Sequence, residues 1–216
     1  MTSLQRLEAV PGNIDAWLLE FAFTSTQLAH DWPILSVKEQ SRARGFYHYQ
    51  DQIRFVSARA ALKRLLAERV GTLPDRLNIS ITASGKPYLA QHAEIQFNLS
   101  HAGSFALIAI SSEGKIGIDI ERCDRDITGL THYVLSPLEH ARACWPEKRF
   151  IDLWVAKEAV LKALGLGIAE NLQDISVLPV PGSHYRIAHE HPDWGIIRAW
   201  PIEAPKDYAA ALALIH

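Results

Sequence analysis

Two acidic residues in the middle of the chain have the types and spacing that phosphate chemistry with a metal ion requires. They belong to the segment Gly117-Ile-Asp-Ile-Glu121. Side chains of a β-strand alternate between its two faces, so a strand here places Asp119 and Glu121 together and turns the isoleucines toward a core. Two carboxylates on one face repel each other unless a cation or another partner relieves them. The alternative is that both are ordinary solvent-facing residues.

A second cluster lies further along the chain, in Trp154-Val-Ala-Lys-Glu-Ala-Val-Leu-Lys162. On a helix, four-residue spacing puts Phe150, Trp154, Glu158 and Lys162 on one face. A strand with two carboxylates and a helix with a third predict a site for Mg²⁺, because this hard cation prefers carboxylates and substrate phosphates as ligands. Lys162, one turn beyond Glu158, can neutralise phosphate charge. We therefore expect phosphoryl chemistry.

A hydroxyl and an imidazole, Ser100 and His101, precede the acidic strand. If residues 95–99, 105–111 and 115–121 form an antiparallel meander, both emerge at the same sheet edge as the two acids. The alternative is that this pair is only a polar turn. A Ser-His hydrolase is disfavoured, because neighbours on a strand point to opposite faces and no Gly-x-Ser-x-Gly segment is present. Phosphate binding is the preferred role for both.

Two basic positions are weaker candidates for contacts with an anion. Gly85, Lys86 and Pro87 predict a turn, in which Gly85 permits unusual dihedral angles and Pro87 stiffens the chain. Arg42 belongs to a basic run on a predicted helix. Most such lysines and arginines are simply solvated, although a ligand rich in phosphate can use them. No Walker-type loop is present, which disfavours P-loop nucleotide chemistry.

Composition excludes several classes of protein. The chain has 216 residues, a net charge of −2 and 48% hydrophobic residues, which is globular and gives no support to nucleic-acid binding. The two cysteines, Cys123 and Cys144, form no CxxC pair, so neither a disulfide framework nor a zinc site is predicted. No signal peptide and no bilayer-spanning apolar run is evident. We expect a cytoplasmic protein that contacts no membrane.

The chain also repeats itself. Ser-x-x-Glu-x-x-Arg-Ala occurs at residues 36–43 and again at 136–143, each time as a helix-capping box. The helical segments at 58–66 and 156–164 also resemble each other. We interpret this as an internal duplication, against the alternative of two unrelated helices with common start signals. Ala60 in the first copy corresponds to Glu158, so the charged site belongs to the second copy and its border with the first.

Hydrophobic periodicity and turn residues predict an α+β fold of two halves, residues 1–112 and 113–216, each with a small antiparallel sheet packed against a long helix. The predicted helices cover residues 36–70, with a break near 47–51, and then 137–145 and 148–164. The predicted strands cover residues 16–23, 78–82, 95–99, 105–111, 115–121, 175–178, 185–188, 195–200 and 208–215.

These motifs together resemble those of the 4′-phosphopantetheinyl transferases. The resemblance rests on the acidic strand and the Lys-Glu helix, preceded in the expected order by Gly85-Lys-Pro87 and Asn98-Leu-Ser-His101, and it spans residues 36–167. Length and duplication are similar to the pseudo-dimeric, surfactin-synthetase-activating type rather than the shorter trimeric type. The resemblance implies two α+β halves with the active site at their interface, and a monomer, because one chain supplies that interface.

The resemblance also implies a reaction and roles. 4′-Phosphopantetheine moves from coenzyme A to a serine of an apo acyl or peptidyl carrier protein, in fatty acid, polyketide or nonribosomal peptide biosynthesis, and adenosine 3′,5′-bisphosphate leaves. By motif position, the implied Mg²⁺ ligands are Asp119, Glu121 and Glu158. Glu158 is also the implied base, directly or through water, and Lys162 the implied pyrophosphate contact. The implied coenzyme A contacts are Arg42, Gly85, Lys86, Pro87, Ser100 and His101.

Two other functions remain compatible with the residues. A Mg²⁺-dependent hydrolase of coenzyme A or a nucleotide pyrophosphate uses the same acids with water as nucleophile. A non-catalytic module that binds coenzyme A or a carrier protein needs no complete metal site, so the intact acids argue against it. Val155, where the family often has a small polar residue, is a mild departure from the pattern.

Overall fold

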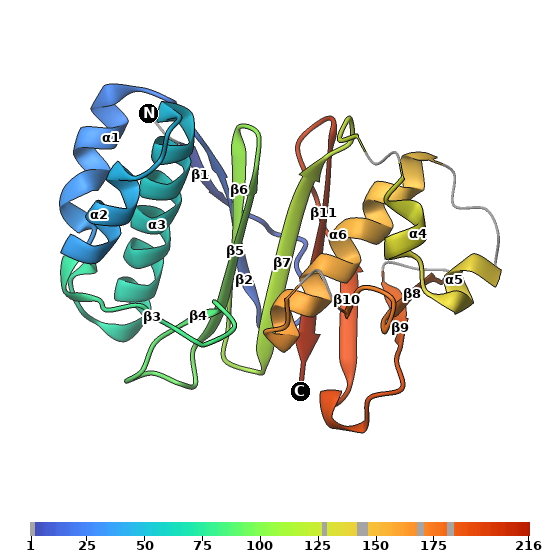
Figure 1. Cartoon of the computed structure of the whole chain (residues 1–216). Helices are drawn as coiled ribbons and strands as arrows, with labels where there is room; N and C mark the ends of the chain where they lie inside the picture. Colours follow the sequence, from blue (N-terminus) through green and yellow to red (C-terminus); the bar gives the residue numbers. More distant parts are fainter. Residues whose placement is uncertain (1–2, 127–128, 142–146, 168–170, 181–183) are drawn as a thin grey trace.

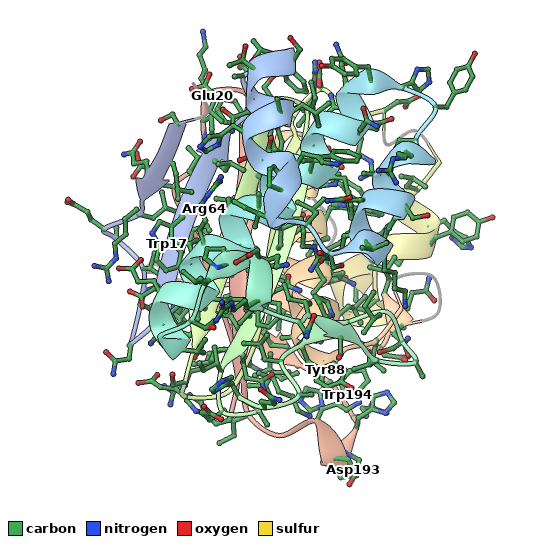
Figure 2. The ribbon with its side chains drawn as sticks, turned by 90° about the vertical axis from the view of Figure 1, so that its left-hand side faces the viewer. Trp17, Glu20, Arg64, Tyr88, Asp193 and Trp194 are labelled. Atoms are coloured by element: carbon green, nitrogen blue, oxygen red, sulfur yellow. The ribbon has the colours of Figure 1, made fainter. Side chains whose placement is uncertain are left out.

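The computed structural model describes residues 3–126, 129–141, 147–167, 171–180 and 184–216. Figure 1 shows helices on both outer sides of the molecule and strands between them. Viewed from the side of α1, α2 and α3, these helices lie in front of the strands (Figure 2). In the part of the chain that is described, no helix combines the length and the apolar character needed to cross a membrane.

The first half forms a four-stranded antiparallel sheet with the order β1-β2-β6-β5. A two-stranded ribbon of β3 and β4 follows its long helix. The bounds are β1 (Ser3–Arg6), β2 (Asp15–Glu20), α1 (Ser25–Asp31), α2 (Val37–Arg44), α3 (Tyr49–Val70), β3 (Ser80–Ile81), β4 (Pro87–Tyr88), β5 (Gln96–Ala102) and β6 (Phe105–Ser111).

The second half forms a five-stranded antiparallel sheet with the order β7-β11-β10-β9-β8. Its elements are β7 (Lys115–Arg122), α4 (Thr131–Val134), α5 (Pro137–Ala141), α6 (Glu147–Leu164), β8 (Ser176–Pro179), β9 (Tyr185–Ala188), β10 (Ile197–Pro201) and β11 (Tyr208–Ile215). The end of the helix predicted for 137–145 lies outside the described residues.

The two halves repeat one topology, which fits the predicted duplication. In each, the first long strand pairs with the last, and the last pairs with the strand before it: β2-β6-β5 in one half and β7-β11-β10 in the other. Each capping box forms, because Glu39 accepts the Ser36 N–H at 2.9 Å and Glu139 accepts the Ser136 N–H at 2.7 Å. The predicted boundary after residue 112 falls in the turn between β6 and β7.

A buried lysine on each long helix makes the same kind of contact in both halves, which supports the predicted duplication. Lys63 on α3 donates to the Ile34 carbonyl at 2.7 Å, and Lys157 on α6 donates to the Val134 carbonyl at 2.6 Å. Lys157 also forms a fully buried ion pair of 2.7 Å with Glu139. Each lysine thus ties its long helix to the segment before a capping box.

The sheets form the two inner layers of an α-β-β-α arrangement. Leu19, Phe97 and Ile108 pack the first sheet against α3, while the second sheet packs against α6. The other faces of both sheets meet in one core, in which Ile116, Ile118 and Ile120 of β7 contact side chains of the first sheet. The alternation predicted for β7 is confirmed, and the core that its isoleucines enter is the one between the two halves.

The predicted meander is wrong. β7 pairs with β11 of the second sheet and not with β6, because its isoleucine face is buried against the first sheet rather than continuing it. β5 is the edge strand of the first sheet and β7 the edge strand of the second, and the two lie side by side (Figure 1). The Asn98 side chain of β5 accepts the Ile118 N–H of β7 at 3.0 Å. We call this β5–β7 border the seam.

Candidate active site at the seam between the two halves

Close packing of α6 on β7 brings the predicted acidic residues together. A Cβ atom at Gly117 would lie 2.0 Å from the Ala159 carbonyl oxygen and 2.5 Å from the Ala163 nitrogen, so only glycine permits this approach. Asp119 follows Gly117 on the same face of β7, and Glu158 and Lys162 lie on the facing helix. The glycine of the motif therefore sets the distance between the strand that holds one carboxylate and the helix that holds another.

Asp119, Lys162 and Ser100 form a compact hydrogen-bonded triangle at the seam. Lys162 Nζ donates to Asp119 Oδ1 at 2.5 Å and to Ser100 Oγ at 2.9 Å, and Ser100 Oγ donates to Asp119 Oδ1 at 2.6 Å. Asp119 is only 3% exposed. The predicted convergence of Ser100 with the acidic strand is present, although it arises across the seam and not within one sheet.

Glu158 is the second buried carboxylate of the site. Its Oε2 lies 3.7 Å from Lys162 Nζ, so one ammonium serves both carboxylates. Burial and the nearby charge of Asp119 raise the pKa of Glu158 to about 7, and burial also raises the pKa of Asp119. Each carboxylate therefore favours any additional positive charge, and Glu158 can exchange a proton near neutral pH.

The third predicted acid, Glu121, pairs with a different cation from the other two. It is ion-paired with Arg125, whose guanidinium lies 4.5 Å from the centre of the Trp154 ring. Within the described ranges, no three or more His, Cys, Asp or Glu side chains are arranged as a ligand cluster for a metal ion. The Mg²⁺ set of Asp119, Glu121 and Glu158 is thus divided between a buried pair at Lys162 and a peripheral ion pair.

The donor chemistry of these residues nevertheless fits Mg²⁺. All the side-chain donors are carboxylate oxygens, and two of them are buried at one positive charge, where their desolvation favours a further cation. Glu121 follows Asp119 on the same face of β7 and is only partly buried, and its carboxylate contacts Arg125 and accepts the Arg122 N–H at 2.9 Å.

A second part of the site is a pocket of about 220 Å³ between α3, β5 and the β3–β4 turn. It is lined by four of the predicted coenzyme A contacts, Arg42, Gly85, Pro87 and His101. Side chains alternate along β5, so Ser100 points to β7 while His101 points to this pocket. The pocket therefore lies beside the triangle. The arginine-rich wall makes the pocket suitable for an anion.

Arg59 is a residue of this pocket that the sequence reasoning missed. Its Nε lies 3.4 Å from Glu39, but its buried Nη1 has no hydrogen-bond partner among the described residues. A buried guanidinium donor without a partner costs free energy unless a ligand satisfies it. The one available signal was its spacing from Phe55 and Leu62, which places these residues on one side of α3.

Lys86 takes a different position from the other predicted contacts. Its ammonium donates to the carbonyl oxygens of Ala163 at 2.8 Å and Ile116 at 3.3 Å, at the end of α6 and the start of β7. Burial, with a smaller effect from Lys115, lowers its pKa to about 8. Lys86 therefore fastens the β3–β4 turn of the first half to α6 of the second, next to Lys162.

Comparisons with known proteins point to one family for the two halves. Residues 115–213 match the model of the 4′-phosphopantetheinyl transferase superfamily, and residues 21–113 match the model described as 4′-phosphopantetheinyl transferase, N-terminal. The border between these matches coincides with the turn between β6 and β7. The triangle at the seam contains side chains from both matched regions.

Individual relatives agree with the family models. A putative 4′-phosphopantetheinyl transferase of Synechocystis is 33% identical over 181 residues, which cover 73% of this chain and 72% of the relative. The 4′-phosphopantetheinyl transferase HetI of Nostoc is 29% identical, covering 90% and 86%. A 4′-phosphopantetheinyl transferase of Bacillus subtilis is 28% identical, covering 84% and 83%. This chain belongs to the 4′-phosphopantetheinyl transferase superfamily.

Proposed function

We propose that this protein transfers 4′-phosphopantetheine from coenzyme A to a serine hydroxyl of an apo carrier protein, with Mg²⁺, and releases adenosine 3′,5′-bisphosphate. One observation carries the proposal: a buried carboxylate pair at Lys162 lies next to an arginine-lined pocket, at the border of the two family matches. This is the arrangement needed to hold a nucleotide at one end and react at its pyrophosphate.

In the proposed complex, the pocket beside α3 binds the 3′-phosphate end of coenzyme A. Arg42 and His101 line it, and Arg59 offers an unpartnered buried donor. Gly85 and Pro87 form another wall, where Gly85 has a positive φ of 88° that shapes the turn. Phosphate in this pocket completes the hydrogen bonding of Arg59, and the rest of the nucleotide extends toward the seam.

The pyrophosphate then lies at Asp119, Glu158 and Lys162. The Lys162 ammonium donates a hydrogen bond to a phosphate oxygen. Ser100 on β5 holds this lysine in place. Asp119, Glu158 and Glu121 would hold Mg²⁺. When bound, Mg²⁺ neutralises charge on the pyrophosphate oxygens as the phosphorus is attacked.

The reaction at phosphorus is a single displacement. The oxygen of the carrier serine forms a bond to the phosphorus that bears pantetheine, and the bond from that phosphorus to the bridging oxygen breaks. The electron pair leaves with adenosine 3′,5′-bisphosphate. Glu158 accepts the proton of the serine hydroxyl directly or through a water molecule.

Intact-protein mass spectrometry of an apo carrier protein tests this proposal. Incubation with the enzyme, coenzyme A and Mg²⁺ should add one phosphopantetheine group to the carrier, and EDTA should prevent the addition. Coenzyme A cleavage without modification of several carrier classes would indicate the hydrolase instead. Coenzyme A binding with neither outcome would indicate a binding module.

Mg²⁺ binding also has a readout that does not depend on activity. Mg²⁺ should raise the melting temperature of the wild type in the presence of coenzyme A, and it should raise that of Asp119→Asn much less. Glu94→Gln is a matched control, because Glu94 is an exposed carboxylate away from the seam. An equal Mg²⁺ effect in all three proteins would contradict the assigned ligands.

The remaining parts of the proposal concern partners and place of action. We infer that the enzyme acts as a monomer, because one chain supplies both sides of the seam. Its proposed partners are coenzyme A and the carrier protein, with no nucleic acid or membrane. The cytoplasm is the proposed compartment, since both substrates meet there. Size-exclusion chromatography with light scattering tests the monomer at enzyme concentrations used for turnover.

A further inference from the structure

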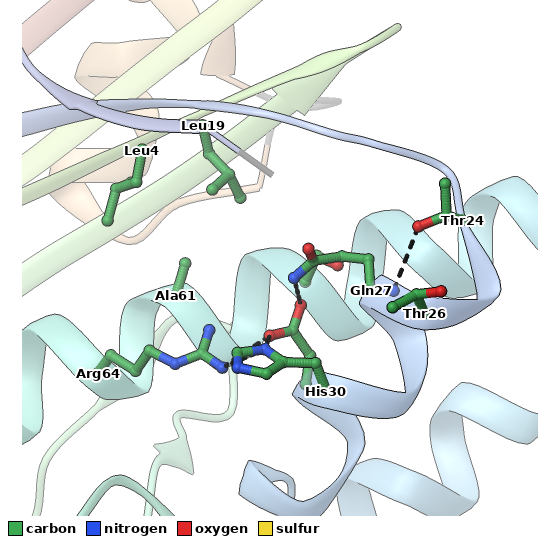
Figure 3. Close-up of a pocket in the computed structure, with 10 residues that line it drawn as sticks. Leu4, Leu19, Thr24, Thr26, Gln27, His30, Ala61 and Arg64 are labelled. Atoms are coloured by element: carbon green, nitrogen blue, oxygen red, sulfur yellow. Dashed lines mark hydrogen bonds and ion pairs between the residues drawn. The ribbon is translucent and has the colours of Figure 1, made fainter. Parts of the chain in front are cut away.

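The first half contains a second cavity, on the other side of α3 from the arginine-lined pocket. Its volume is about 630 Å³, and it lies between the β1–β2 edge of the sheet and helices α1 and α3. Figure 3 shows Leu4 and Leu19 on the sheet side, and Ala61 and Arg64 on the helix side. Its size falls within the range of about 300–1,000 Å³ that is usual for small-molecule sites.

The periodicity of α3 separates this cavity from the proposed active site. Ser57, Ala61 and Arg64 line the second cavity, and Phe55, Arg59 and Leu62 line the arginine-rich pocket. Each set has the spacing of one helix face, and the sets are two residues out of phase, about 200° around the axis. A ligand in the second cavity therefore occupies a different space from coenzyme A.

The polar end of the cavity is organised around a buried acid. Asp31 is 1% exposed and is already satisfied: Gln27 Nε2 donates to it at 2.7 Å, and Arg64 Nη2 lies 2.8 Å from its Oδ1. His30 Nδ1 lies 3.1 Å from Arg64 Nη2 (Figure 3). Because the Asp31 carboxylate already has partners, the cavity does not favour a ligand that carries a cation or only hydrogen-bond donors.

Donors, in contrast, remain available there. Both described polar contacts of Arg64 use Nη2, and its side chain is 34% exposed, so its Nε–H and Nη1–H groups can donate to a ligand. Ser57 also lines the cavity, and its buried Oγ has no hydrogen-bond partner within the described part of the chain. The charge of Arg64 is balanced by Asp31, which favours a neutral acceptor over a full anion.

We propose that this cavity binds an apolar small molecule whose polar end is a neutral carbonyl group, at a site separate from that of coenzyme A. The apolar body contacts Leu4, Leu19 and Ala61. The carbonyl oxygen accepts hydrogen bonds from the free donors of Arg64, and the Ser57 hydroxyl gains a partner. The proposal does not depend on the reaction proposed for the seam.

Three probes with one apolar body test the site: 4-phenylbutyramide, 4-phenylbutyrate and 4-phenylbutylamine. Each probe is titrated into the ¹⁵N-labelled full chain with saturating coenzyme A. Chemical shifts of the protein's backbone N–H groups are followed by NMR. The amide should bind saturably and shift resonances of α1 and the Ser57 face of α3, the carboxylate should bind more weakly, and the amine should not bind. No saturable binding of the amide, equal binding of the amine, or displacement by coenzyme A would overturn the proposal.

Cavity-filling variants make the test independent of the polar cluster. Ala61→Leu should remove at least tenfold of the affinity for 4-phenylbutyramide, because leucine occupies the space of the apolar body. Glu68→Leu is the matched control, since it adds the same side chain to an exposed position of α3. Unchanged binding in Ala61→Leu would place the probe elsewhere and overturn the proposal.

The Ser57→Ala variant distinguishes a binding role of the Ser57 hydroxyl from a purely structural one. Loss of an unpartnered buried hydroxyl should leave the melting temperature unchanged or higher, while binding of the amide weakens about fivefold. A lower melting temperature with unchanged affinity would show that Ser57 supports the fold alone, and would overturn its place in the site.

Discussion

The Ser100 hydroxyl donates to Asp119 Oδ1 at 2.6 Å across the seam, so a serine of the first half holds a carboxylate of the second. The same hydroxyl accepts from Lys162 at 2.9 Å. Ser100 therefore fixes the relative position of the Asp119 carboxylate and the Lys162 ammonium, on which the proposed reaction depends. With Asn98 and Lys86, this side chain joins the two halves at one site.

Ser100→Ala should lower kcat about tenfold and change KM for coenzyme A little, because Asp119 and Lys162 lose their common partner. The cost in stability should be about 1 kcal/mol. Ser111→Ala is the control, since the hydroxyl of this buried serine of β6 accepts the Glu113 backbone N–H and has no other hydrogen bond among the described residues. Steady-state kinetics separate the two parameters; an effect confined to KM would instead make Ser100 a direct contact of coenzyme A.

Glu158→Gln should abolish transfer and raise the thermal stability of the ligand-free protein. The substitution removes a buried negative charge that Asp119 repels, while Lys162 keeps its closer partner at 2.5 Å. A gain of about 1 kcal/mol corresponds to about 3 °C for a chain of this size. Differential scanning calorimetry measures it, with Glu94→Gln as the exposed control. A strongly destabilised variant would assign Glu158 to the fold.

Arg59→Gln should raise KM for coenzyme A about tenfold, because the proposed phosphate contact is charged and buried. KM for 3′-dephospho-coenzyme A should not change, since that substrate lacks the group that the pocket binds. Arg69→Gln, another arginine of α3 that pairs with Asp15, should behave like the wild type with both substrates. Equal losses with the two substrates would argue against the 3′-phosphate assignment.

The lowered pKa of Lys86 predicts a stability that rises with pH. Below pH 8 the folded protein holds a charged, partly desolvated ammonium, which burial penalises. Between pH 8 and the unfolded value of 10.5, the unfolded chain binds the additional proton, so the penalty is relieved as pH rises. Urea unfolding measures the free energy of unfolding of the wild type and of Lys86→Met. The value for the wild type, relative to that for Lys86→Met, should be higher at pH 9.5 than at pH 7. A constant difference would mean an ordinary lysine pKa.

Gly117→Ala should destabilise the protein by about 3 kcal/mol and stop turnover, because the new Cβ overlaps backbone atoms of α6 that cannot move independently. Gly167→Ala is the control, since a Cβ there meets nothing within 4 Å. Chemical denaturation measures both. A stable and active Gly117→Ala protein would show that α6 tolerates a greater distance from β7.

Patterns within single elements were predictable from the sequence. The alternation of Asp119 with its neighbouring isoleucines, the shared face of Glu158 and Lys162, and the two capping boxes follow from geometry that repeats every two or 3.6 residues. The order of the motifs was also sufficient to identify the family. These features depend on neighbours in the chain, so no knowledge of the rest of the fold was needed.

Only the tertiary structure decided which elements meet. Burial of the β7 isoleucines between the sheets places β7 beside β5, where Ser100 reaches Asp119, instead of in a meander with β6. The fold also brings Arg59 into the anion pocket and fastens Lys86 to α6. These contacts join residues far apart in sequence, and the global burial of apolar surface selects them, so local periodicity carried no information about them.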